Sequence, residues 1–247
     1  MSRSPLLPWV LGSGLLLVSG ASAWAGSWEE HRFDSGGRVP VVEVELYRGI
    51  VRFQARPPSE PVTLKVALVS YDDHRPGESI DASIRPLPKG ALDLFSSPGR
   101  VQIEAPTLRD LVVVDLSAPA AAELRIHIVH YGEVTIEGAL GEVEVDLFQG
   151  QVNLRDIRGP AVAHIVRDGT IRARLAPPVS DRAMALTTYE GDIVLEAPEQ
   201  VAGRLQIASA RGEIRNEFVT KAEGGPRAGE PILIRNAKGT IHVRPLH

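Results

Sequence analysis

Three carboxylate residues hold equivalent positions in a repeated phrase, because Glu133, Asp192 and Glu213 each directly follow a glycine. If the segments that carry them stack in register, the side chains lie in a row along one edge, together with Gln151 and Thr170. Two such carboxylates could serve as the acid and base of glycosidic bond cleavage, or bind calcium. The simpler interpretation is that they are solvated turn residues that discourage aggregation. We therefore predict no catalytic residue, no metal site and no cofactor.

Aromatic residues beside the repeated glycines provide a second candidate site. Tyr131, Phe148 and Tyr189, together with Tyr47, would lie at corners of a stacked structure. Such a row could form a strip that stacks on sugars or binds a protein, or could simply cover apolar surface at turns. The strip is the better functional lead, because a long sheet is a large rigid surface. The candidate binding residues are thus Tyr131, Phe148, Tyr189, Glu133, Asp192 and Glu213.

The histidines do not suggest a metal site. His127 and His130 are three positions apart, so on a regular strand their side chains project to opposite faces. His164 lies further along the chain, and each is expected to be a surface or edge side chain. The sequence also lacks a Gly-x-Ser-x-Gly elbow, a Walker loop, a dinucleotide fingerprint and a His-Glu-x-x-His helix.

These residues are placed by a phrase in which a glycine precedes two apolar residues at alternating positions. From Leu124 to Leu175 its glycines recur about every nine or ten residues, so each interval holds one strand and one turn. Glycine provides the open backbone conformation at a corner, and the alternation sends every second side chain into a shared interior. The glycines of the phrase are Gly49, Gly99, Gly132, Gly141, Gly150, Gly169, Gly191, Gly212 and Gly239.

This cadence predicts an all-β, single-domain β-solenoid, a β-helix-like stack of short strands. Valine, isoleucine, leucine and alanine fill the expected interior positions, and polar residues alternate with them, so one face of each strand is wet. We expect three regions: a signal peptide over residues 1–25, an irregular amino-terminal β cap over 26–110, and the repetitive solenoid over 111–247. A cap would block the unpaired backbone edge at that end.

The first residues indicate export. Arg3 precedes an apolar run from Leu6 to Val18, which Pro8 interrupts and which ends in Ala-Ser-Ala-Trp-Ala up to Ala25, with cleavage expected after Ala23 or Ala25. The run is shorter than the ~20 residues that a membrane-spanning helix needs, as is typical of a signal peptide. We expect a periplasmic, surface or secreted protein with no membrane span in its mature chain.

Composition argues against nucleic acid as a partner. The formal net charge is −4, the basic residues are scattered, and only 5% of the residues are aromatic. A nucleic-acid interface would require a basic patch, and single-strand binding would require stacking platforms. The chain has no cysteine, so no disulfide framework supports the fold.

The succession from Val112 to Val243 resembles a bacterial group of domains, the putative adhesin family. The resemblance is carried by Val-Val-Val-Asp-Leu-Ser-Ala-Pro from Val112, by Thr-Tyr-Glu-Gly-Asp-Ile around Gly191, and by Ala-Arg-Gly-Glu-Ile-Arg-Asn around Gly212. It covers more than half of the chain. It implies a right-handed β-helix-like fold and an envelope or surface location, and it transfers no catalytic residue.

The leading hypothesis is therefore an exported, non-enzymatic β-solenoid, an adhesin or an envelope binding or scaffold protein. Its partner would be an envelope or extracellular component, either protein or polysaccharide. One alternative is a carbohydrate-active β-helix that uses Glu133, Asp192 and Glu213; another is an accessory or sensor domain of envelope stress signalling. Two carboxylates about 5 to 10 Å apart in a groove would favour the enzyme, and a flat face would favour binding.

Overall fold

The computed structural model describes residues 28–72, 74–76, 80, 84–105, 110–218 and 229–246; the predicted signal peptide lies outside the described residues. The described residues form a 15-stranded sheet and one short 3-10 helix. The elements in chain order are β1 (Glu29–Phe33), β2 (Val41–Arg56), β3 (Val62–Val69), β4 (Asp93–Ser97), β5 (Arg100–Ala105), β6 (Leu111–Pro119), β7 (Glu123–Glu137), β8 (Val143–Ile157), β9 (Ala161–Leu175), β10 (Met184–Glu190), β11 (Ile193–Ala197), η1 (Glu199–Arg204), β12 (Leu205–Ser209), β13 (Glu213–Asn216), β14 (Ile232–Lys238) and β15 (Thr240–Pro245).

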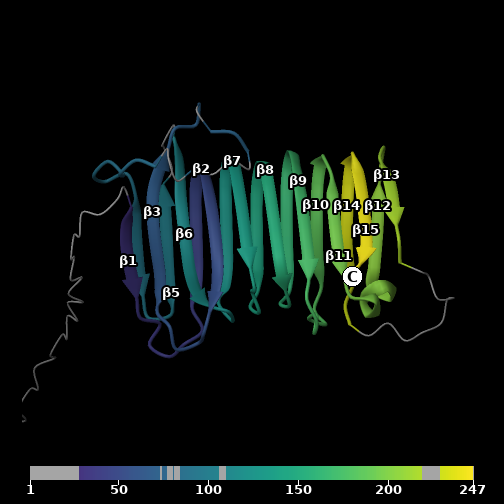
Figure 1. Cartoon of the computed structure of the whole chain (residues 1–247), viewed down its shortest axis with the longest axis horizontal. Coiled ribbons are helices and arrows are strands. Elements are labelled where there is room, and N and C mark those ends of the chain that lie inside the picture. Colours follow the sequence, from purple (N-terminus) through teal and green to yellow (C-terminus); the bar gives the residue numbers. More distant parts are fainter. Residues whose placement is uncertain are drawn as a thin grey trace, which may run out of the picture.

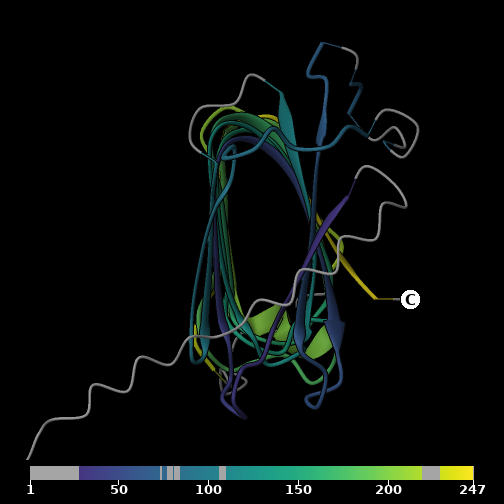
Figure 2. The same ribbon diagram turned by 90° about the vertical axis from the view of Figure 1, so that its left-hand side faces the viewer.

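The sheet folds over on itself into two opposed walls (Figure 2). The long strands β2, β7, β8 and β9 bend at a corner, so each contributes its first half to the first wall and its second half to the second wall. The strand pairs β10–β11, β14–β15 and β12–β13 continue the two walls, and each such turn of the chain is called a coil here. Neighbouring coils pair in parallel. The predicted all-β, single-domain stack of strands is confirmed.

The coils do not follow chain order at either end of the stack. The coil of β2 lies between the coil of β5 and β6 and that of β7, and β14–β15 lies between β10–β11 and β12–β13 (Figure 1, yellow strands among green ones). Residues 41–56 pair with 123–137 over nearly their whole length, so this part of the expected cap region is a coil of the stack. The strands β1, β3 and β4 pair antiparallel at that end.

The core lies between the two walls and is built from stacked columns of like residues. Inward positions are apolar because every second side chain of a strand faces the same side. Burial of each valine or isoleucine contributes about 1.5–3 kcal/mol, which gives the stack its stability. One buried column of the first wall consists of Val44, Ile126, Val145, Ala163, Leu186 and Ile234, and one of the second wall of Val51, Val134, Val152, Ile171, Ile193 and Ile241.

Within the described part of the chain, no helix has both the length and the apolar character needed to cross a membrane.

Candidate binding surface at the glycine corner

The corner where the walls meet is a column of stacked glycines, which we call the glycine corner. A β-carbon on Gly150 would lie 1.8 Å from the carbonyl oxygen of Gly132, and one on Gly191 would lie 1.9 Å from that of Gly169. Both glycines also have positive φ angles, +134° and +126°. The column thus needs glycine for close approach as well as for conformation. Similar close contacts occur at the opposite corner. There a β-carbon on Gly159 would meet the carbonyl oxygen of Gly141, and one on Gly141 would meet that of Ala122.

The predicted carboxylate row exists on the second wall, beside the glycine corner. Its order along the stack is Glu133, Gln151, Thr170, Asp192, Thr240 and Glu213. Glu133 and Asp192 are three strand spacings apart, about 14 Å, and Asp192 and Glu213 are two apart, about 10 Å.

Each of these carboxylates is engaged locally. Asp192 accepts a hydrogen bond from the backbone N–H of Thr240 at 2.7 Å. Glu213 accepts two from Arg215 at 2.7 and 3.0 Å, and this hydrogen bonding lowers the pKa of Glu213. A general acid needs a raised pKa, so Glu213 is poorly suited to protonate a leaving group.

Glu133 belongs to a different environment, a polar cluster with Tyr131 and His74. The Tyr131 hydroxyl donates to Glu133 at 2.7 Å, and Nε2 of His74 lies 2.5 Å from the same oxygen. The His74 side chain is 4% exposed and that of Glu133 15%. Burial and the Glu133 carboxylate raise the pKa of Tyr131, which keeps its hydroxyl protonated. These contacts hold the His74 side chain against Glu133 on the second wall.

The same cluster contains an aromatic contact that the sequence did not reveal. The rings of Tyr71 and Tyr131 meet edge to face at 5.6 Å, and the guanidinium of Arg48 lies 4.2 Å from the centroid of Tyr71. Such a cation–π contact contributes about 0.5–1 kcal/mol at an exposed site. Tyr71 and His74 come from a proline-containing stretch of sequence without periodicity, so the sequence could not predict their role. Their partners Tyr131 and Glu133 were predicted, because both stand beside a repeated glycine.

The other three predicted aromatics lie together on the outside of the glycine corner. Tyr47, Phe148 and Tyr189 each follow the last inward residue of the first wall, on β2, β8 and β10. Tyr189 is 60% exposed, and Val129 and Val166 hold the corresponding position on β7 and β9, where they are also exposed. We call this set, with His130, the aromatic strip; it consists of Tyr47, Val129, His130, Phe148, Val166 and Tyr189.

His130 joins two rings of the aromatic strip. Its imidazole centroid lies 5.4 Å from that of Tyr47 and 6.5 Å from that of Phe148, and Nε of Arg48 donates to its Nδ1 at 3.4 Å. Burial first, and the charge of Arg48 second, lower the pKa of His130 below its ordinary 6.5. The neutral imidazole therefore predominates at neutral pH, and the strip carries no charge at this position.

The environment of His130 predicts how the stability of the fold depends on pH. Because the folded state disfavours the imidazolium, the stability that His130 contributes is present above pH 6.5 and is lost as the pH falls, when the unfolded chain takes up the proton first. We expect the NMR midpoint of His130 below 6.5 and a higher midpoint in Arg48→Ala, which removes the repulsive charge. A wild-type midpoint at or above 6.5 would contradict this arrangement.

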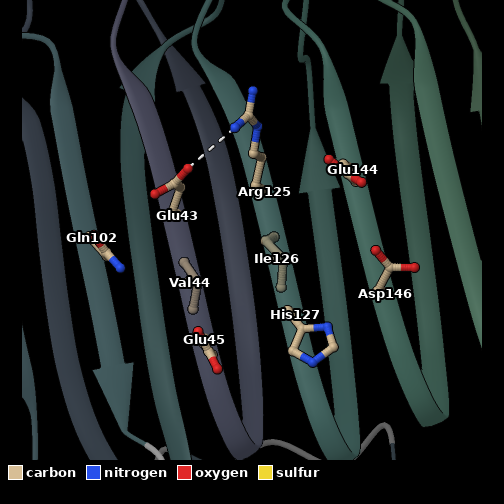
Figure 3. A pocket seen from close by; sticks show the side chains of 9 residues that line it. All are labelled: Glu43, Val44, Glu45, Gln102, Arg125, Ile126, His127, Glu144 and Asp146. Carbon is tan, nitrogen blue, oxygen red and sulfur yellow. Dashed lines mark hydrogen bonds and ion pairs between the residues drawn. The ribbon is translucent and has the colours of Figure 1, made fainter.

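The outer surface of the first wall holds a shallow depression with charged walls (Figure 3). Glu43 accepts hydrogen bonds from Arg100 at 2.5 Å and from Arg125 at 3.4 Å. His127 lies in the depression, away from His130, and Nδ1 of His164 lies 3.5 Å from the Asp146 carboxylate. Among the residues that the structure describes, no group of three or more histidine and carboxylate side chains is placed to hold a metal ion.

Fold and surface together define a two-walled parallel β-solenoid with a glycine corner and, along it, an aromatic strip in which Tyr189 is exposed and the other rings are half-buried. No protein-family model matches the chain, and no curated protein does. A putative cell adhesion protein from Clostridium sporogenes has a similar structure, with a TM-score of 0.50 at 8% identity over 89% of this chain and 99% of that chain. A putative adhesin from Bacteroides fragilis gives 0.38 at 11% identity over 89% and 96%. At these identities the likeness to the first protein shows a shared fold alone.

Proposed function

We propose that this chain is an exported, non-enzymatic β-solenoid that binds a component of the cell envelope or extracellular space through the aromatic strip. The observation that carries the proposal is the exposure of Tyr189 and its neighbours along a corner whose backbone is fixed by stacked glycines. Aromatic side chains contribute large contact area with few rotatable bonds, which suits them to binding. The apolar leader of residues 1–25 supports export.

Two further features support binding over glycosidic bond cleavage. The three predicted carboxylates are engaged locally: Glu133 is held with Tyr131 and His74, and Asp192 and Glu213, which are about 10 Å apart, are bound by the backbone N–H of Thr240 and by Arg215. Arg215 lowers the pKa of Glu213, the opposite of what a general acid needs. The fold shared with a protein described as a putative cell adhesion protein agrees with a surface role. A solenoid of this kind offers a long rigid surface to a partner.

The proposal predicts that purified protein is retained by an isolated cell-envelope fraction and that Tyr189→Ala weakens retention about tenfold, the effect of losing roughly 1.4 kcal/mol of contact. Phe95→Ala is the matched control, because Phe95 is 55% exposed on β4, outside the strip. Both variants should keep the wild-type melting temperature within about 2 °C. Equal retention of wild type and Tyr189→Ala would exclude the strip as the binding surface.

A further inference from the structure

The three six-membered rings of the aromatic strip occur on alternate coils, and the imidazole of His130 lies on the coil between the first two. Along the stack the strands run β2, β7, β8, β9, β10, and the rings of Tyr47, Phe148 and Tyr189 belong to the first, third and fifth of these. Two strand spacings separate successive rings, about 10 Å, so the three rings span about 19 Å along the stack.

The alternation has a structural cause in the backbone. On β7 two residues, Val129 and His130, lie between the residues paired with Leu46 and Arg48, where β2 has only Tyr47. On β9, Val166 and Arg167 likewise stand opposite Tyr189 alone. These bulges place an extra residue on β7 and β9, the coils that carry no tyrosine or phenylalanine of the strip; on β7 the two residues include His130, whose imidazole lies between Tyr47 and Phe148.

Polar side chains follow each ring in the sequence. Arg48 follows Tyr47, Gln149 follows Phe148, and Glu190 follows Tyr189. The guanidinium of Arg48 lies 5.5 Å from the centroid of Tyr47 and 4.2 Å from that of Tyr71. The planar groups of these polar side chains can donate to or accept from two neighbouring hydroxyls. At the Tyr189 end the charges are paired, since Lys238 lies 3.4 Å from Glu190 and Arg167 pairs with Asp168 at 3.2 Å, whereas Arg48 places a positive charge at the Tyr47 end. The combination of rings with these polar groups suits a ligand rich in hydroxyl groups.

We propose that the aromatic strip binds an extended β-1,4-linked glycan that runs along the axis of the stack. In such a chain alternate sugars present the same face, so equivalent faces recur once per disaccharide, a length close to two strand spacings. The apolar faces of alternate sugars stack on Tyr47, Phe148 and Tyr189, and their hydroxyls bind the polar neighbours. The inference rests on the proposed binding function and names its ligand class.

The test measures binding of cello- and chito-oligosaccharides of two, four and six sugars by calorimetry, with maltohexaose as the α-linked control. Affinity should rise at each added disaccharide, about five- to tenfold per ring engaged, and maltohexaose should bind at least tenfold more weakly. Tyr189→Ala should reduce the affinity for the hexasaccharide to that for the tetrasaccharide. Phe148→Ala, which interrupts the strip at its centre, should abolish the gain from length, and Phe95→Ala should change nothing.

The outcomes separate this inference from the proposed function. If the envelope fraction retains the protein in a Tyr189-dependent manner but neither β-1,4 series binds, the glycan assignment is wrong and the strip binds another partner, such as a protein. If maltohexaose binds as tightly as the β-linked hexasaccharides, the proposed match between the disaccharide repeat and the spacing of the rings is also wrong. If neither the envelope fraction nor any oligosaccharide binds, both proposals fail. Circular dichroism of each variant distinguishes lost binding from lost folding.

Discussion

Replacement of Gly150 by alanine is expected to lower the melting temperature by about 10 °C or more, a loss of roughly 3 kcal/mol or greater. The new methyl group would lie 1.8 Å from the carbonyl oxygen of Gly132, and the residue would have to adopt a φ of +134°. Strain at such a φ alone costs about 1–3 kcal/mol. The clash is with backbone, so relief requires the coils of β7 and β8 to separate, which breaks their hydrogen bonds.

Two other glycines provide graded controls for this prediction. At Gly132 the nearest atoms are the side-chain tips of Ile128 and Leu147, at 2.7 and 2.9 Å, which can move at lower cost. At Gly203, in η1, nothing lies within 4 Å of the new methyl group. Thermal unfolding should rank alanine variants at 150, 132 and 203 from most to least destabilised. A Gly150→Ala protein as stable as Gly203→Ala would refute the stacked-glycine account of the corner.

The second large effect is expected at Arg204, which is 5% exposed and lies at the opposite corner from the glycines. Its guanidinium donates to three backbone carbonyl oxygens, those of Glu230 at 2.7 Å, Ser180 at 2.8 Å and Arg182 at 2.9 Å. One side chain thus joins the loop before β10 to the chain before β14. Only a planar fork with several N–H groups reaches all three acceptors at once.

Arg204→Lys should therefore reduce the free energy of unfolding by about 3 kcal/mol although the charge is kept, because buried carbonyl oxygens lose their donors. Urea denaturation measures the change. Arg235→Lys is the control, because Arg235 is exposed on β14 and the same substitution there leaves no buried acceptor. Equal unfolding midpoints for the two lysine variants would show that the three hydrogen bonds do not hold the loops together.

Much of the fold could be predicted because its causes are local. A glycine is required wherever a carbonyl oxygen approaches the β-carbon position, and inward residues such as Val134 and Ile136 alternate with polar ones along a single strand. Both rules operate within a few residues of sequence. For the same reason the carboxylate row that contains Glu133, Asp192 and Glu213 was predicted, since each residue keeps a fixed offset from its glycine.

The order of the coils was not predictable in the same way. A parallel strand can pair with any neighbour of similar pattern, so nothing in residues 41–56 specifies β6 on one side and β7 on the other. The same holds for β14–β15, which come last in the chain but lie between β10–β11 and β12–β13 in the stack. Pairing partners are set by how the whole stack closes and by the residues that end it, which are non-local effects.

The sequence by itself determined the strand period, the corner glycines and the presence of aromatics beside them. Only the tertiary structure decided which aromatics act together. Tyr131 directly precedes a glycine and Phe148 stands two residues before one, yet with the extra residue on β7 Tyr131 contacts Glu133 and Tyr71, while His130 lies against Tyr47. A one-residue bulge redirects every side chain beside it, and whether a bulge forms depends on the neighbouring coil rather than on the strand's own residues.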